Sequence, residues 1–182
     1  LLSRKKSIFI IDFNNMNIEY LKYNLKNIKW ILIDSNIRRE LASSKYHERV
    51  DECKQALELL SLQNNKISSF RDLNINRAKE ILTLPLKLRK RVTHVVSEND
   101  RVSKMKEAIK EQSIKKMGDL LIKSHESLRD NYEVSCGEID AMINFSKSIE
   151  GWIGGRIMGG GFGGATINLI KLGYENFFID KL

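Results

Sequence analysis

Five glycines occupy six consecutive positions near the end of the segment RIMGGGFGG, which runs from Arg156 to Gly164. Glycine at this density costs backbone entropy, and it is kept where the backbone needs a positive φ or where another group must approach closely. The glycines can form a tight hairpin against which a helix packs. Alternatively, their consecutive N–H groups can form a concave nest for an anion such as a phosphate. The spacing alone leaves both interpretations open.

The surroundings of this loop do not match the common phosphate-binding motifs. Gly159, Gly161 and Gly164 have the spacing G-x-G-x-x-G, but that fingerprint follows a strand and opens a helix. Here the alternating, β-branched segment ATINLI follows, and it predicts a strand over 165–170. No Gly-Lys-Ser/Thr sequence follows the glycines, so a P-loop is also excluded.

Other residues whose side chains could bind a ligand or take part in a reaction are dispersed along the chain. Tyr46, in the segment SSKY, is expected in the first turn of a helix, with its hydroxyl either in water or on a sugar hydroxyl. The histidines His47, His94 and His125 have no partner at i+3 or i+4 and no neighbouring cysteine, so no metal site is expected. The sequence contains no carboxylate pair with an obvious catalytic spacing and no Ser–His–Asp set, and we assign no catalytic residue in it.

The composition indicates a globular protein with a basic surface. A chain of 182 residues with 42% hydrophobic content can build a sizeable core in one domain, or in one and part of another. The net charge is +8, but the lysines form no block, so nucleic-acid binding is not expected and an anionic substrate would suit the surface equally well. Cys53 and Cys136 lie outside any C-x-x-C motif, which is typical of a reducing compartment. With no signal peptide and no apolar run long enough for a membrane span, we expect a cytoplasmic protein that does not bind a membrane.

The elements that must position these residues occur in three groups. The segments SIFIID, IEYLKYN and IKWILIDSN predict strands of a meander. Apolar periodicity then predicts helices from residue 43, around 75–82, over 86–111 and over 113–130, and a further helix that begins after Ser135 with a capping box to Glu138. Ser43 or Ser44 is the expected cap of the first helix. Strands, then helices, then a helix, a loop and a strand predict an α+β fold.

Four segments, in the same order along the chain, resemble signatures of galactokinases, which are members of the GHMP family of small-molecule kinases. NIRRELASSKYHERVDECKQAL resembles the family segment that leaves the N-terminal domain and carries a sugar-contacting tyrosine. RVTHVVSENDRV and SHESLRDNYEVSCGEID are similar to two further signatures. RIMGGGFGG is similar to the third family motif, R-M-T-G-G-G-F-G-G, with Met158 in place of the threonine. The resemblance covers nearly the whole chain.

The resemblance implies a domain organisation. Residues 1–40 would be strands from the end of the GHMP N-terminal domain, and residues 41–182 would be a helical block and the GHMP-kinase-like C-terminal domain, with helices packed on one face of a small antiparallel sheet. The chain begins Leu1-Leu2 and ends on FFIDKL, where a strand is expected to begin, so both ends are expected to be truncated. Strands left without half of the fold are expected to expose apolar surface and a free edge.

The resemblance also implies an activity. The intact protein would be a monomeric sugar-1-kinase that uses ATP and Mg²⁺ to phosphorylate the C1 hydroxyl of galactose. A non-catalytic sugar and ATP sensor, or a kinase for a related sugar such as N-acetylgalactosamine, are the alternatives. Tyr46 would contact the sugar, and the loop of Gly159, Gly160, Gly161, Phe162, Gly163 and Gly164 would lie beside the nucleotide phosphates. The family motifs that carry the catalytic aspartate and the serine-rich phosphate loop are absent from this sequence, so the Mg²⁺ ligands are not assigned and the chain alone is expected to be inactive.

Overall fold

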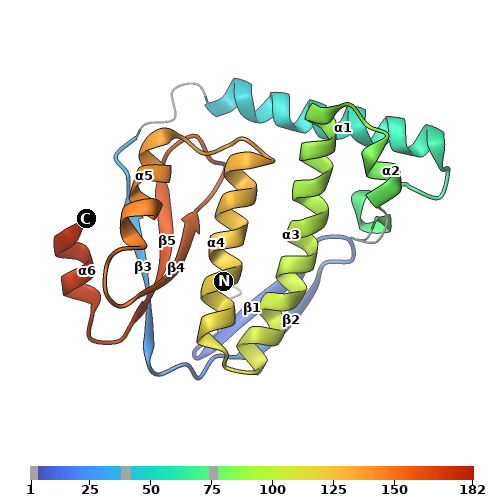
Figure 1. The fold of residues 1–182 in the computed structure, drawn as a ribbon. Coiled ribbons are helices and arrows are strands. Elements are labelled where there is room, and N and C mark those ends of the chain that lie inside the picture. The colour runs from blue at the N-terminus through green and yellow to red at the C-terminus, as the bar shows by residue number, and fades with distance from the viewer. Residues whose placement is uncertain (1–3, 38–41, 74–77) are drawn as a thin grey trace.

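Strands and helices alternate in blocks along the chain, as Figure 1 shows for the computed structural model, which describes residues 4–37, 42–73 and 78–182. The predicted α+β class is confirmed. The elements in chain order are β1 (Ser7–Asp12), β2 (Asn17–Lys22), β3 (Ile28–Asp34), α1 (Ala42–Gln63), the 3₁₀ turn η1 (Phe70–Asp72), α2 (Ala78–Leu82), α3 (Leu86–Lys110), α4 (Ile114–Asp130), α5 (Gly137–Ser146), β4 (Trp152–Ile157), β5 (Ala165–Lys171) and α6 (Glu175–Lys181).

The described strands form two separate antiparallel sheets. β1 pairs with β2 as a hairpin, whereas β3 pairs with β5 along its whole length in a three-stranded sheet of order β3-β5-β4. The meander expected for the first three strands is therefore wrong at β3. Ile31 and Ile33 pack into the cluster of Ile170, while Ile28 and Trp30 pack into the cluster of Leu169, so β3 has apolar partners on both faces in this position. The pairing joins the segment 1–40 to the rest of the chain, and its assignment to a preceding domain stays a prediction.

The helices α3 and α4 lie side by side (Figure 1): α4 lies against the three-stranded sheet, whereas α3 contacts β2 of the hairpin. α4 packs directly on β4, because Gly118 and Gly154 let the two backbones approach closely: a Cβ added to Gly154 would lie 2.4 Å from the Gly118 carbonyl oxygen. Leu169 of β5 contributes to the same core as Met117 and Leu121 of α4. The predicted packing of helices on a small antiparallel sheet containing 165–170 is confirmed for α4 and α5. The helices after residue 86 do not all lie on one face of that sheet, because α6 packs on the other face.

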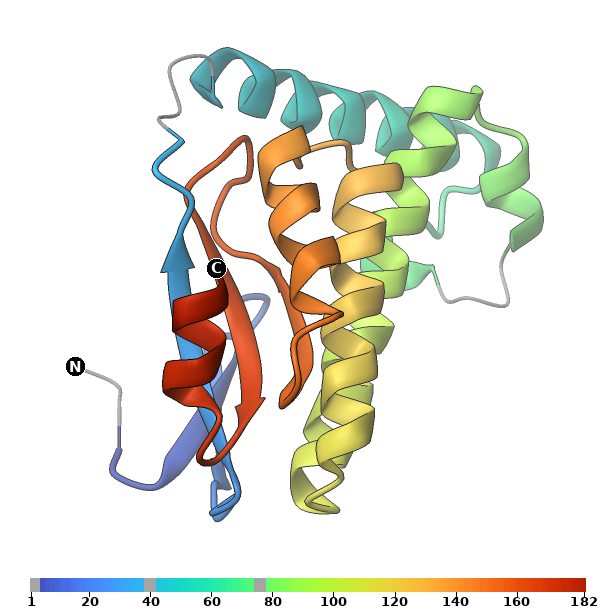
Figure 2. The ribbon, with the colours of Figure 1, turned by 60° about the vertical axis from the view of Figure 1, so that its left-hand side comes forward.

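The C-terminal segment forms the helix α6, not the expected strand. Tyr174 and Phe178 lie one helical turn apart and pack in the same cluster as Ile170, which neighbours Leu169 and so faces the other side of β5. α6 thereby lies on the side of the sheet away from α4, as the turned view in Figure 2 shows. The aromatic residues favour a strand by local propensity, but burial of Phe178 against the sheet overrides that preference.

The caps of two helices differ from the expected ones. α1 begins at Ala42, so Ser43 and Ser44 lie inside its first turn. Cys136 caps α5 without a side-chain hydrogen bond, so the prediction of a capping box between Ser135 and Glu138 is wrong. The Ser135 hydroxyl instead donates to Asp140 Oδ1 at 2.6 Å. The start of the helix predicted at residue 75 lies outside the described residues.

The β1–β2 hairpin leaves large apolar side chains in solvent. Phe13 is 74% exposed and Met16 is 65% exposed at its turn, and Phe9 and Ile18 are also exposed. Within the described part of the chain, β1 pairs with β2 alone and leaves its other edge open. The expected exposure of apolar surface and of a free strand edge is confirmed. None of the helices in the described ranges has the length and hydropathy that crossing a membrane requires.

Candidate functional site

The glycine-rich loop connects β4 to β5, which are antiparallel neighbours, so the segment forms a hairpin. Four of its glycines and one larger residue adopt positive φ values: 80° at Gly159, 83° at Gly161, 59° at Phe162, 117° at Gly163 and 83° at Gly164. Such a run of left-handed conformations requires glycine at most positions. The hairpin interpretation is confirmed, and it does not decide whether the loop also binds an anion.

Two neighbouring segments hold the loop by its backbone. The Phe162 N–H donates to the Val134 carbonyl at 2.6 Å, and the Gly164 N–H donates to the Ile37 carbonyl at 3.3 Å. A Cβ added to Gly161 would lie 2.4 Å from the Val134 oxygen, and one added to Gly163 would lie 2.8 Å from the Ile37 oxygen. These contacts are backbone against backbone, so any side chain at Gly161 or Gly163 would displace the loop.

The loop is open at Gly160. A Cβ added to Gly160 would meet no atom within 4 Å, and the φ of Gly160 is not positive. Among the described residues, no protein group accepts a hydrogen bond from the backbone N–H of Gly159, Gly160 or Gly161. Neighbouring N–H groups without protein partners can bind an anion.

The first turn of α1 lies beside the glycine loop. Lys45 Nζ is 5.6 Å from the centroid of the Phe162 ring, and Tyr46, the next residue, is 49% exposed. Tyr46 also lies near Tyr132: burial, the neighbouring Cys53 and the charge of Tyr46 together raise the pKa of Tyr132 to about 12. The structure thus places the predicted sugar-contacting residue and the predicted phosphate-binding loop at one end of the molecule.

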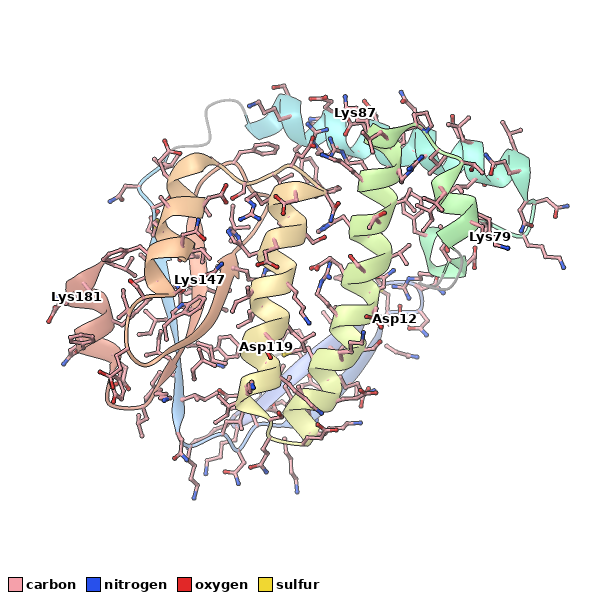
Figure 3. The ribbon with its side chains drawn as sticks, viewed as in Figure 1. Asp12, Lys79, Lys87, Asp119, Lys147 and Lys181 are labelled. Atoms are coloured by element: carbon pink, nitrogen blue, oxygen red, sulfur yellow. The ribbon has the colours of Figure 1, made fainter. Side chains whose placement is uncertain are left out.

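An ionic cluster that is buried at Arg49, Glu52 and Arg91 connects α1, α3 and the segment after α4. Arg91 of α3 donates through Nε to Glu52 Oε2 at 2.6 Å and through Nη2 to Glu133 Oε2 at 2.7 Å. Arg49 also pairs with Glu52, and Lys87, at the end of α3 that meets α1 (Figure 3), lies 2.5 Å from Glu52 Oε1. We refer to these five residues as the Arg91 cluster.

Sequence reasoning did not identify the Arg91 cluster. Its members come from three separate segments of the chain, and no motif rule joins Glu52 to an arginine 39 positions later. One signal was available: Arg91 lies on the apolar face of α3 beside Leu88 and Val92, both of which are buried. A charged residue on a buried face requires a buried partner.

The arginine of the glycine motif anchors β4 to the helices. Arg156 Nη1 donates to Ser124 Oγ at 2.8 Å and to Glu98 Oε2 at 3.3 Å, and its Nε donates to the Ile157 carbonyl. Burial lowers the pKa of Arg156, whereas the neighbouring Glu98 opposes that shift. These bonds join β4 to α3 and α4.

The two buried histidines have packing roles. His94 stacks on Tyr132 with ring centroids 4.5 Å apart, and burial lowers its pKa to about 4. His125 Nε2 lies 3.3 Å from Asp140 Oδ1, and the Ile157 N–H approaches its Nδ1; burial lowers the pKa of this imidazole as well. In the described ranges, no three His, Cys, Asp or Glu side chains gather in a group that could hold a metal ion.

The sequence is similar to bacterial galactokinases. It is 41% identical over 170 residues to the galactokinase of Thermotoga neapolitana, an alignment that covers 93% of this chain and 46% of that protein. It is 39% identical over 181 residues to the galactokinase of Thermosipho africanus, with 99% of this chain and 49% of that protein covered. No family model matches the chain.

The fold is similar to those of two kinases. The galactokinase of Lactococcus lactis complexed with galactose superposes with a TM-score of 0.90 at 31% identity, over 97% of this chain and 46% of that chain. The L. major mevalonate kinase in complex with R-mevalonate superposes with a TM-score of 0.55 at 14% identity, over 96% of this chain and 43% of that chain. This second similarity concerns the fold alone.

These similarities define the class: the chain has the fold of the GHMP small-molecule kinases. Within that class, it is homologous to the C-terminal part of galactokinases. The resemblance inferred from the four sequence segments is confirmed. The chain spans about half the length of the curated relatives it matches.

Proposed function

We propose that this chain is the C-terminal part of a galactokinase, and that the complete protein transfers the γ-phosphoryl group of ATP to the C1 hydroxyl of galactose. The single observation that carries the proposal is the similarity, in both fold and sequence, to a galactokinase complexed with galactose. The relatives named above are galactokinases, so neither the sensor nor the kinase for another sugar is favoured.

Within this reaction, the chain supplies positioning. Phosphoryl transfer depends mainly on alignment of the reactants and on neutralisation of charge. The half-exposed Tyr46 would offer its hydroxyl to a galactose hydroxyl. The N–H groups of Gly159, Gly160 and Gly161, which have no acceptor among the described residues, would face the phosphates of ATP, since the loop is open at Gly160.

We assign no catalytic base and no Mg²⁺ ligand to this chain. Its described residues contain no group of three potential metal ligands. We place those groups in the part of galactokinases that lies outside the alignment with this chain. When bound with ATP, Mg²⁺ supplies neutralisation of phosphate charge.

The proposal is tested by assaying the complete protein with ATP, Mg²⁺ and galactose, and by detecting galactose 1-phosphate by phosphorus NMR. N-acetylgalactosamine is assayed in parallel. We expect galactose 1-phosphate from the complete protein and none from the 182-residue chain alone. Binding of galactose without turnover would support a sensor, and preferred phosphorylation of N-acetylgalactosamine would support the other alternative. Turnover by the chain alone would show that the catalytic groups are misassigned.

Replacing Tyr46 by phenylalanine is expected to weaken the use of galactose by the complete protein. Loss of one neutral hydrogen bond costs about 0.5–1.5 kcal/mol, or roughly threefold to tenfold in kcat/KM for galactose. The KM for ATP and the Tm should stay unchanged, because the ring and its packing remain. Steady-state kinetics with each substrate varied in turn, together with thermal unfolding, measure all three quantities.

A matched control is available at the other end of the chain. Tyr174 donates its hydroxyl to the exposed Glu150 at 3.0 Å, in the cluster with α6 and away from the glycine loop. Tyr174→Phe should leave the galactose kinetics unchanged. Galactose kinetics that do not change in Tyr46→Phe would remove Tyr46 from the site.

A further inference from the structure

We propose that Arg91 is a positioning residue that couples the helix carrying Tyr46 to the glycine loop, so that the sugar contact and the phosphate contact move as one unit. The consequence for catalysis rests on the proposed function. The coupling itself concerns the contacts of this chain and is testable without any substrate.

Each of the three guanidinium nitrogens of Arg91 donates a hydrogen bond to a different residue. Its side chain is 0% exposed. Nε donates to Glu52 Oε2 at 2.6 Å, Nη1 to the Asn131 carbonyl at 2.5 Å and Nη2 to Glu133 Oε2 at 2.7 Å. A planar guanidinium holds such partners in a fixed relative geometry, which the single ammonium group of a lysine cannot do.

The Glu52 contact fixes α1. Glu52 and Tyr46 belong to the same helix, less than two turns apart, so an anchor at Glu52 sets the position and rotation of the first turn. Arg49, which is itself buried, pairs with Glu52 from within α1. Lys87 reaches the other oxygen of Glu52 from the start of α3. The helix is therefore attached to α3 by charged groups close to the proposed sugar contact.

The other two contacts of Arg91 fix the segment 131–134, which holds the glycine loop through Val134. Glu133 has a φ of 56°, a left-handed conformation that is uncommon for a residue other than glycine. Arg91 holds this segment at both Asn131 and Glu133. The next residue, Val134, accepts the Phe162 N–H at 2.6 Å and lies where a Cβ on Gly161 would clash. A shift of the segment 131–134 would thus shift the loop.

The first turn of α1 also contacts the glycine loop directly. Lys45, next to Tyr46 in α1, places its ammonium group 5.6 Å from the centroid of the Phe162 ring. Tyr46 also lies near Tyr132, whose pKa is raised mainly by burial and in smaller part by Cys53 and Tyr46. The first turn of α1 therefore lies directly beside the glycine loop and is also linked to it through Arg91 and the segment 131–134.

The test compares Glu133→Ala with Lys90→Ala. Lys90 Nζ also pairs with Glu133, at 2.8 Å; Glu133 is exposed and Lys90 is half-buried. Both variants delete this ion pair, but Glu133→Ala alone also deletes the contact with Arg91. Because Glu133 lies at the surface, the variant is expected to fold, and its Tm is measured to verify this.

The first readout is amide hydrogen exchange of the Phe162 N–H in the protein without substrate. We expect exchange about tenfold faster in Glu133→Ala and unchanged in Lys90→Ala, because only in the first variant does the segment bearing Val134 lose one of its two contacts with Arg91. Arg91→Lys, which keeps the positive charge but loses the planar guanidinium with its several donors, should also accelerate exchange of the Phe162 N–H. Equal exchange in Glu133→Ala and Lys90→Ala would overturn the coupling.

The second readout is a double-mutant cycle with Tyr46→Phe in the complete protein. Glu133→Ala should raise the galactose KM about threefold to tenfold, and Tyr46→Phe should then have a smaller effect than in the unmodified protein, because coupled sites are not additive. Additive effects would overturn the coupling. Failure of the unmodified protein to phosphorylate galactose would refute the proposed function, while the exchange result would still decide the coupling.

Discussion

Replacing Glu52 by glutamine is expected to lower the free energy of unfolding by about 3–5 kcal/mol at neutral pH, because it removes the carboxylate from a buried ionic cluster. Glu52 is 6% exposed and lies against Arg91, which is 0% exposed, and Arg49, which is 9% exposed. Glutamine keeps the shape but not the charge, so two guanidinium groups would lie close together without the carboxylate that they share. The remaining partners of Arg91, Asn131 and Glu133, offset this repulsion in part.

The same carboxylate predicts how stability depends on pH. Burial by itself raises the pKa of Glu52, but hydrogen bonds from Arg49, Lys87 and Arg91 outweigh it and lower the pKa from 4.5 to about 2. Because the pKa is lower in the folded state, the stabilisation is complete above the unfolded pKa and disappears as the pH falls from about 4.5 towards 2. A shift of this size corresponds to about 3 kcal/mol.

Urea unfolding at several pH values between 7 and 2 measures both effects. The gap between the unmodified protein and Glu52→Gln should be largest at pH 7 and should narrow below pH 4.5. Asp51→Asn is the control in the same helix: Asp51 is 65% exposed and pairs with Lys54 at 3.6 Å, so its loss should cost less than about 1 kcal/mol. A Glu52→Gln variant as stable as this control at neutral pH would contradict the prediction.

Replacing Gly161 by alanine is expected to abolish most activity of the complete protein and to destabilise it. Gly161 has a φ of 83°, and an added Cβ would lie 2.4 Å from the Val134 oxygen and 2.7 Å from the Val134 Cβ. The conformation alone costs about 1–3 kcal/mol, and the contact forces the loop away from Val134. A displacement of about 1 Å in a phosphate-contacting loop can reduce kcat/KM by roughly a hundredfold.

Gly160→Ala separates the two roles of the loop. Its φ is not positive and no atom lies within 4 Å of an added Cβ, so its stability should stay within about 0.5–1 kcal/mol of the unmodified protein. If the open side of the loop approaches the phosphates of ATP, this methyl group should still raise the KM for ATP. Thermal unfolding and ATP kinetics on both variants measure these effects. Full activity in Gly161→Ala would exclude the loop from the site.

The positions of most elements could be predicted from the sequence because they depend on local patterns. The apolar period of α3 and α4 predicts helices whose observed bounds, Leu86–Lys110 and Ile114–Asp130, differ from the predicted ones by about one residue. The alternation of ATINLI predicts β5. Local propensity failed at α6, where the buried Phe178 decides the conformation through contacts with residues of other elements.

The candidate site could be predicted in part, for the same reason. The glycine loop and Tyr46 belong to short segments whose residue types and order are informative, and the four segments together indicate the galactokinase family. The Arg91 cluster could not be found this way. Its members come from α1, α3 and the segment after α4, and their pairing depends on how these elements pack.

The sequence by itself determined that this protein has α+β elements, a glycine-rich hairpin and the motifs of a galactokinase, because each of these is encoded by neighbouring residues. The tertiary structure decided that β3 pairs with β5, that α6 covers the sheet on the side away from α4, and that Arg91 joins α1 to the loop segment. The β3–β5 pairing joins residues such as Ile28 and Lys171, and Arg91 lies 39 positions from Glu52 and 42 from Glu133. The entropy of closing such long loops is offset only when the whole core assembles, so no local pattern in the sequence reports it.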